Sequence, residues 1–394
     1  MAESVRSGLE TLLSEPNRIP ASGRLGLLCN PASVDRNLVH ARERIDEAFP
    51  GRLKALYSPQ HGFFAEKQDN MVESRHVTDP VLGLPAFSLY GETRRPAAEM
   101  FDPIDLLLVD LQDVGTRVYT FVYTMAHCME AARETGRKVV VLDRPNPAGG
   151  MVVEGNLLDP ERCASFVGKY PIPMRHGLTI GELAVFFNEA FGIGCDLEVV
   201  PMAGWRRRMR FAETGLPWVA PSPNLPTPTS ALVYPGQVIW EGTNVSEGRG
   251  TTQPFELFGA PFFDVPAIVQ ALGGSRPPGA FLRAHAFEPV AGKWAGDLCR
   301  GFQLHVTEPA VFRPYGLALR LLHAVMATSG DAFQWKPPPY EYEFERLPMD
   351  LILGDRRVRT RLEAGEPVAE IERDWEADLR RFGEEARRFH RYPD

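Results

Sequence analysis

Asp105-Leu-Leu-Leu-Val-Asp110 is the most apolar of the short runs in the first half of this chain. Four aliphatic residues in a row predict a strand that is buried on both faces, as the central strand of a parallel sheet is. A helix is predicted from about Val118 to Thr135, ended by Gly136, and Lys138-Val-Val-Val-Leu142 predicts the next strand. This order of strand, helix and strand is typical of a parallel α/β sheet.

The same alternation extends from this unit in both directions. Upstream, strands are predicted at residues 25–29, 53–57 and 86–90. Downstream, Thr179-Ile-Gly-Glu182 predicts a capping box that opens a helix running to Phe191, and residues 196–200 predict a further strand. We therefore expect an α/β protein built on a doubly wound, mostly parallel sheet.

The length of 394 residues favours two domains, since a single core rarely serves so long a chain. Composition changes near residue 263, and Gly273-Gly-Ser-Arg-Pro-Pro-Gly279 is rich in turn formers. We expect one domain over residues 1–263 and a smaller one over residues 264–394. For the second, the sequence predicts a strand at 302–306, helices at 315–328 and 368–388, and a linker at 336–339.

Composition excludes several classes of function. The net charge of -8, with no basic stripe to offset it, argues against a nucleic-acid partner. Five scattered cysteines without a C-x-x-C pair favour a reducing compartment over a disulfide framework or a structural zinc site. No apolar run reaches the ~18 residues of a membrane span and no secretory signal is apparent, so we expect a cytoplasmic protein. No G-x-G-x-x-G follows the first strand, so no dinucleotide cofactor is expected.

Polar side chains cluster just after the predicted strands. In open parallel sheets, ligands bind at the carboxyl edge, so these side chains are expected along one rim. They are His61, Asp110, Gln112, Asp113, Asp143, Arg144 and Asn146. A second polar concentration, Glu241-Gly-Thr-Asn-Val-Ser-Glu-Gly-Arg-Gly-Thr-Thr-Gln-Pro-Phe-Glu256, has no helical or strand period. Its glycines allow close backbone approach and its side chains supply donors, so it is expected to wrap a polar ligand.

The many acids of these loops fit two chemistries. Glycoside hydrolysis uses a pair of carboxylates, and metal-assisted hydrolysis uses acids and histidines as ligands. The acids are Glu66, Glu92, Asp110, Asp113, Asp143, Glu182, Glu241 and Glu256. His61 and His176 each precede a glycine, but no H-x-x-x-H or D-x-D places two metal ligands on one element. Structural roles stay open too, such as a buried Asp143–Arg144 ion pair and histidines bonded to backbone carbonyls.

Several motifs together resemble the DUF1343 family, whose characterised members are NamZ-type exo-β-N-acetylmuramidases. The motifs are Ser58-Pro-Gln-His-Gly62, Tyr90-Gly91, Asp110-Leu-Gln-Asp-Val-Gly-Thr-Arg-Val-Tyr119, Leu142-Asp-Arg-Pro-Asn-Pro147, Pro173-Met-Arg-His-Gly177, Thr179-Ile-Gly-Glu182, Ser222-Pro-Asn224, Glu241-Gly-Thr-Asn-Val-Ser246 and Gly248-Arg-Gly-Thr-Thr252. The resemblance implies a Rossmann-like domain, an auxiliary C-terminal domain and an active site in the cleft between them. It also implies release of terminal N-acetylmuramic acid from peptidoglycan fragments, without a cofactor.

One departure from the family pattern bears on catalysis. Many members carry Pro-Glu-His-Gly where this chain has Pro59-Gln60-His61-Gly62. Glutamine cannot donate a proton at neutral pH, so either Glu66 replaces the glutamate or the chemistry is altered. The lack of a secretory signal would confine such an enzyme to imported or recycled fragments.

The resulting hypothesis is a glycosidase that acts on small muropeptide-type sugars from the non-reducing end. Glu66 or Glu241 is the candidate acid. Asp110 or Asp113 is the candidate base, or else orients the substrate's own acetamide. His61 is also a catalytic candidate. Arg117, Arg144 or Arg249 is expected to clamp the lactyl carboxylate. Candidates for substrate binding are Gln60, Arg117, Tyr119, Asp143, Arg144, Asn146, His176, Asn224, Asn244, Ser246, Arg249 and Thr251. Two alternatives stay open: an inactive amino-sugar-binding protein, which Gln60 motivates, and a metal-dependent hydrolase such as a deacetylase. The sequence is silent on the oligomeric state.

Overall fold

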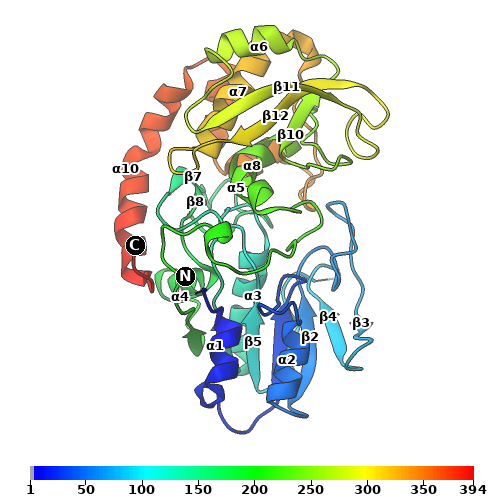
Figure 1. Ribbon diagram of the computed structural model, residues 1–394, viewed down its shortest axis with the longest axis vertical. Coiled ribbons are helices and arrows are strands. Elements are labelled where there is room, and N and C mark those ends of the chain that lie inside the picture. The colour runs from blue at the N-terminus through cyan, green and yellow to red at the C-terminus, as the bar shows by residue number, and fades with distance from the viewer. Residues whose placement is uncertain (1–3, 92) are drawn as a thin grey trace.

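The computed structural model describes residues 4–91 and 93–394. A seven-stranded sheet lies at one end of the molecule and a three-stranded sheet at the other (Figure 1). The strands of the larger sheet, in spatial order, are β3 (Val77–Thr78), β4 (Pro85–Ser88), β2 (Leu53–Ser58), β1 (Leu25–Cys29), β5 (Leu106–Asp110), β6 (Lys138–Leu142) and β9 (Leu197–Val200).

This sheet has the doubly wound topology that the sequence predicts. All neighbouring strands are parallel except β3 and β4. Without β3, the chain order across the sheet is that of a Rossmann fold, and the direction of winding reverses between β1 and β5. Strand β5 pairs with both β1 and β6, and all five of its residues are buried. The stretch after Asp105 is therefore central, as predicted.

Alternate side chains of the central strands enter two separate cores, because successive residues of a strand point to opposite faces. Leu108 and Val140 pack with helices α1 (Gly8–Ser14) and α2 (Ala41–Ala48). Leu107 and Val139 pack on the other face with α3 (Phe121–Thr135) and α4 (Ile180–Ala190). Helix α3 ends at the predicted Gly136, which adopts φ +66°, and α4 begins with the predicted Thr179–Glu182 capping box.

The C-terminal part is α+β, as predicted. Its antiparallel sheet has the order β10 (Leu257–Ala260), β12 (Cys299–Val306) and β11 (Ala280–Phe287). Its helices are α5 (Pro228–Gln237), α6 (Val265–Leu272), α7 (Pro314–Ser329), α8 (Pro348–Leu353), α9 (Arg356–Glu363) and α10 (Val368–Ala386). The sequence analysis missed β10, β11 and the shorter helices, and the division at residue 263 stays a prediction.

Two connections join the two ends of the molecule. A pair of short strands, β7 (Glu154–Leu157) and β8 (Pro173–Arg175), lies between the sheets and contacts α10. Helix α10 runs back along the side of the molecule, and the chain ends beside α4 (Figure 1). Within the described residues, none of the helices has the length and apolar character needed to cross a membrane. All five cysteines are buried and free.

Candidate active site

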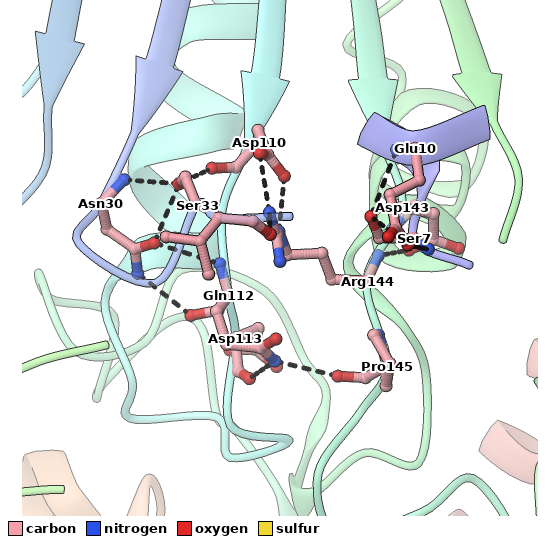
Figure 2. A network of polar contacts seen from close by, with 12 residues as sticks. Ser7, Glu10, Asn30, Ser33, Asp110, Gln112, Asp113, Asp143, Arg144 and Pro145 are labelled. Atoms are coloured by element: carbon pink, nitrogen blue, oxygen red, sulfur yellow. Dashed lines mark hydrogen bonds and ion pairs between the residues drawn. The ribbon is translucent and has the colours of Figure 1, made fainter. Parts of the chain in front are cut away.

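The point where the winding reverses is filled by a buried polar network (Figure 2). The Arg144 guanidinium donates from Nε to Asp110 Oδ1 at 2.5 Å and from Nη2 to Oδ2 at 2.8 Å. Their side chains are 5% and 0% exposed. The Gln112 backbone N–H donates to Asn30 Oδ1, and the Gln112 side chain donates to the Pro145 carbonyl at 2.9 Å. Asp110 and Arg144 thus lie on the predicted rim, but they bind each other.

Asp143 and Asn146 hold loops in place at the same edge. The Asp143 carboxylate accepts hydrogen bonds from Thr179 Oγ1 and the Gly181 N–H, both at 2.8 Å, and from Tyr392 Oη at 2.5 Å. Burial raises the pKa of Asp143 to about 6, against the effect of the Tyr392 hydrogen bond. Asn146 donates to the Leu178 carbonyl at 2.9 Å. These contacts tie the chain end and the start of α4 to the sheet.

Asp113, His176 and Arg117 are also enclosed by the fold. His176 Nε2 lies 3.3 Å from Asp113 Oδ2, and the side chains are 0% and 4% exposed. The Arg117 guanidinium donates to four backbone carbonyls, those of Asn156, Ile172, Ile352 and Leu353. Burial lowers the pKa of Arg117. The seven rim or interior candidates Asp110, Asp113, Arg117, Asp143, Arg144, Asn146 and His176 do not line the pocket described next.

A pocket lies where loops of the large sheet meet the C-terminal part of the chain; we term it the inner pocket. It is lined by Gln60, His61, Asn70, Val118, Tyr119, Thr120, Phe121, Val167, Ser222, Asn224, Leu225, Tyr234, Glu241, Arg249, Phe255, Tyr340 and Glu341. Its volume is about 30 Å³, room for one or two water molecules. Two of its residues are buried acids, Glu241 and Glu341.

Glu341 is the acid that the sequence analysis missed. Its Oε1 accepts a hydrogen bond from Gln60 Nε2 at 3.0 Å, and its Oε2 accepts one from Tyr90 Oη at 2.5 Å. Thr120 Oγ1 donates to Gln60 Oε1 at 2.9 Å, which fixes the amide with its NH2 group toward Glu341. Burial raises the pKa of Glu341, and the bonds from Tyr90 and Gln60 only partly oppose this. Glu341 therefore holds its proton to higher pH than an exposed glutamate does, which suits a general acid.

Glu241 has a different environment in the same pocket. Its carboxylate accepts hydrogen bonds from Arg249 Nη2 at 2.7 Å, Tyr340 Oη at 2.8 Å and Asn70 Nδ2 at 3.1 Å. Arg249 also pairs with Glu247, with Nε 3.3 Å from Oε1. Three donors thus hold this carboxylate in one orientation. The pocket holds two acids with different partners among the described residues, one bound by an arginine and one bound by neutral groups only.

His61 and Tyr119 supply neutral polar groups. Burial lowers the pKa of His61 to about 4, so its ring is neutral at neutral pH. His61 Nδ1 lies 2.9 Å from the Lys67 carbonyl, so Nδ1 carries the proton and Nε2 is left as an acceptor. Burial raises the pKa of the Tyr119 hydroxyl, and the nearby Ser222 only partly opposes this. Within the described chain this hydroxyl has no hydrogen-bond partner.

The remaining predicted residues are dispersed. Glu66 is exposed and its carboxylate accepts from the Phe64 N–H at 3.2 Å, outside the pocket lining. Asn224 lines the pocket and donates to the Gln68 carbonyl at 2.9 Å. Ser246 and Thr251 bond within their own loop, to Gly248. Glu92 lies outside the described residues.

A second, wider hollow adjoins the inner pocket; we term it the outer cleft. Its volume is about 590 Å³. It shares Asn70, Glu241, Arg249 and Tyr340 with the inner pocket, and its other lining residues are Asp69, Met71, Thr243, Asn244, Glu247, Gly292, Lys293, Trp294, Gln334, Trp335, Lys336 and Pro337. Residues 336–339, predicted as a linker, carry the chain along this wall to Tyr340 and Glu341.

One signal in the sequence could have identified Glu341. Tyr340-Glu-Tyr-Glu343 places acids between aromatic residues directly after three prolines, where neither helix nor strand is expected. Across residues 4–91 and 93–394, no group of three or more histidine, cysteine or acidic side chains is arranged to hold a metal ion.

Comparison with known proteins covers nearly the whole chain. The family description "Exo-beta-N-acetylmuramidase NamZ, N-terminal" matches residues 25–229, and "Exo-beta-N-acetylmuramidase NamZ, C-terminal" matches residues 232–392. The "Peptidoglycan beta-N-acetylmuramidase NamZ" of Bacillus subtilis is 43% identical over 386 residues, which are 98% of this chain and 91% of that protein.

Two crystal structures of DUF1343 family proteins from Bacteroides fragilis have the same fold. One superposes with a TM-score of 0.88 at 31% identity and covers 99% of both chains. The other has a TM-score of 0.77 at 27% identity and covers 100% of both chains.

Proposed function

The chain belongs to the NamZ family of exo-β-N-acetylmuramidases, and we propose on that premise that it releases N-acetylmuramic acid from the non-reducing end of peptidoglycan fragments. The observation that carries this proposal is the pair of buried glutamates in one pocket. Glu241 and Glu341 are 4% and 5% exposed; burial raises the pKa of Glu341, whereas Glu241 is paired with Arg249. Most glycoside hydrolases use a pair of carboxyl groups, one of which acts as the acid.

Glu341 is the general acid in this proposal. Its raised pKa favours the protonated form, and the proton passes to the glycosidic oxygen as the bond to the anomeric carbon breaks. This takes over the role that the resemblance suggested for a glutamate at position 60. Gln60 keeps a part in it, because its amide orients Glu341 through the 3.0 Å hydrogen bond.

Glu241 acts as the charged partner. Positive charge develops at the anomeric carbon in the transition state, and an ionised carboxylate beside it stabilises that charge. Arg249, Tyr340 and Asn70 hold the carboxylate in position. The inner pocket has room beside both glutamates for the water that completes hydrolysis. Glu241 lines both hollows and Glu341 lines only the inner pocket, so in this proposal a sugar in the outer cleft places its glycosidic oxygen in the inner pocket beside Glu341.

The experiment is hydrolysis of 4-nitrophenyl N-acetyl-β-muramide by the purified protein, with release of N-acetylmuramic acid followed by mass spectrometry. Wild type should release it, and Glu241→Gln should lose at least about 100-fold in kcat/KM; Glu341→Gln should lose as much on the disaccharide of N-acetylmuramic acid and N-acetylglucosamine, whose leaving oxygen needs a proton. Glu345→Gln, an exposed acid of the segment that carries Glu341, is the matched control and should keep full activity.

The same assay separates the alternatives. Binding of muramides without turnover would favour an inactive sugar-binding protein. Activity that a chelator abolishes and zinc restores would favour a metal-dependent hydrolase. A cytoplasmic location, favoured by five free, buried cysteines, also belongs to the proposal, and cell fractionation tests it.

A further inference from the structure

The three arginines expected to clamp the lactyl carboxylate are all engaged with protein groups. Arg117 donates to four backbone carbonyls, and Arg144 binds Asp110. Arg249 reaches the pocket but is paired with both Glu241 and Glu247. A muramyl substrate therefore needs another cation, because the lactyl carboxylate is the charged group that distinguishes it from N-acetylglucosamine.

Lys336 is a cation of the outer cleft that is free for this role. In the part of the chain that the structure describes, Lys336 forms no ion pair, whereas Lys293 of the same cleft is 2.8 Å from Glu247. Burial lowers the pKa of Lys293, and Lys336 lies close enough to lower it further. The Lys336 ammonium is 5.6 Å from the centroid of the Tyr340 ring, on the wall that leads to Glu241. The lining has three acids and three cations, and Arg249 and Lys293 are both paired with acids of the cleft, which leaves Lys336 as its available positive charge.

The backbone fixes Lys336 relative to Glu241. The Lys336 N–H donates to the Gly242 carbonyl at 2.9 Å, and the Asn244 N–H donates to the Gln334 carbonyl at 3.0 Å. These bonds pair residues 334–336 with residues 242–244 in antiparallel fashion, so Lys336 is bonded to the residue next to Glu241. The Lys336 backbone is therefore held at a set position from the proposed reaction centre, within reach of its side chain.

Two tryptophans line the same hollow and suit a sugar ring. Trp294 donates from Nε1 to the Asn244 carbonyl at 2.6 Å, and Trp335 donates from Nε1 to Glu363 at 2.7 Å. Both indole N–H groups are thus satisfied, and both side chains stay partly exposed. Aromatic side chains of this kind offer apolar area to the C–H face of a saccharide.

We propose that the outer cleft binds the muramyl ring that is to be cleaved, with the ring against Trp294 and Trp335 and the lactyl carboxylate on Lys336. The inference rests on the proposed function for the identity of the sugar, but it concerns recognition and not bond cleavage. Lys336 is then the residue that selects N-acetylmuramic acid over N-acetylglucosamine.

The test is calorimetric titration of the intact protein with free N-acetylmuramic acid and, separately, with N-acetylglucosamine. Lys336→Met keeps the aliphatic stem and removes the charge, so it should weaken N-acetylmuramic acid binding about tenfold and leave N-acetylglucosamine binding unchanged. Lys336→Arg should retain most of the preference. Lys54→Met, at an exposed position on β2, is the control for loss of a positive charge and should change neither affinity.

Trp335→Ala should weaken both sugars together, because stacking does not depend on the lactyl group; thermal unfolding of this variant checks that it is folded. The inference is overturned if Lys336→Met alters both affinities equally or neither, if folded Trp335→Ala binds both sugars as wild type does, or if wild type binds no N-acetylmuramic acid. Selective binding through Lys336 without muramide hydrolysis would refute only the proposed enzymatic function. If Lys336→Met hydrolyses the muramide and binds both sugars as wild type does, only this inference is refuted.

Discussion

Gln60→Glu restores the residue that many relatives carry and places a second carboxyl group against Glu341. Gln60 Nε2 lies 3.0 Å from Glu341 Oε1, so the new carboxyl oxygen would occupy nearly the same place. Two negative charges at that distance repel by about 5 kcal/mol at an effective dielectric constant of about 20. The folded variant is therefore expected to keep one proton between the two carboxyl groups well above the ordinary glutamate pKa of about 4.3.

This retained proton sets the sign of the pH dependence. The folded variant binds one proton more than its unfolded chain does once the pH exceeds the unfolded pKa, so its stability falls as pH rises. Relative to wild type, the free energy of unfolding of Gln60→Glu should fall by about 1.4 kcal/mol per pH unit above the pH at which wild-type Glu341 loses its proton, because below that pH both folded proteins hold one proton more than their unfolded chains. Urea unfolding at unit steps of pH measures this slope.

A control variant shows whether an added negative charge alone causes the slope. Gln68→Glu adds the same charge at an exposed position and should show no such slope. On the chromogenic muramide, the alkaline limb of the kcat/KM profile of Gln60→Glu should move to higher pH, because Glu341 holds its proton longer. A difference from wild type that stays flat over the whole pH range in which both proteins fold would mean that positions 60 and 341 do not share an environment, and the assignment of Glu341 would lose its basis.

Two further predictions concern buried charges away from the pocket. Burial raises the pKa of Glu154 to about 7, so the stability that protonated Glu154 contributes is lost as pH rises from the unfolded value near 4.5 through 7. Glu154→Gln does not titrate, so its free energy of unfolding should gain about 3 kcal/mol relative to wild type between pH 4.5 and 8. Equal pH profiles of the two proteins would contradict this. Arg207 and Glu182 form an ion pair at 2.6 Å with side chains 1% and 0% exposed, so Arg207→Met should lower the free energy of unfolding in urea by about 3–5 kcal/mol. Arg162→Met, which breaks an exposed pair, should lower it by less than about 1 kcal/mol. Similar costs for the two variants would argue against the buried pair.

Much of the larger sheet could be predicted because its signals are local. The apolar run before Asp110, the Gly136 stop and the Thr179–Glu182 capping box each determine structure through neighbours in sequence. Strands β10 and β11 were missed for the opposite reason. Strand β11 mixes buried Leu282 with exposed Arg283 and Ala284, so it lacks a clean alternation, and it is held by pairing with β12.

The candidate site was harder to predict because it joins distant segments. The rule that residues following parallel strands meet at one edge correctly placed Asp110, Asp143 and Arg144 together. It could not show that Asp110 and Arg144 bind each other, or that Asp143 binds Tyr392 at the chain end. Glu341 lies 281 positions from its partner Gln60, and no sequence pattern links them. The polar loop from Glu241 to Glu256 was recognised from composition, and two of its residues, Glu241 and Arg249, line both hollows.

The most direct test of the central claim compares leaving groups in Glu341→Gln. A general acid matters when the leaving oxygen is basic, as in the disaccharide of N-acetylmuramic acid and N-acetylglucosamine, and hardly matters for 2,4-dinitrophenolate. We predict that Glu341→Gln loses about 100- to 10,000-fold in kcat/KM on the disaccharide and far less on the dinitrophenyl muramide, while Glu66→Gln follows wild type on both. Equal losses on the two substrates, or the selective loss in Glu66→Gln instead, would contradict the assignment of Glu341 as the acid.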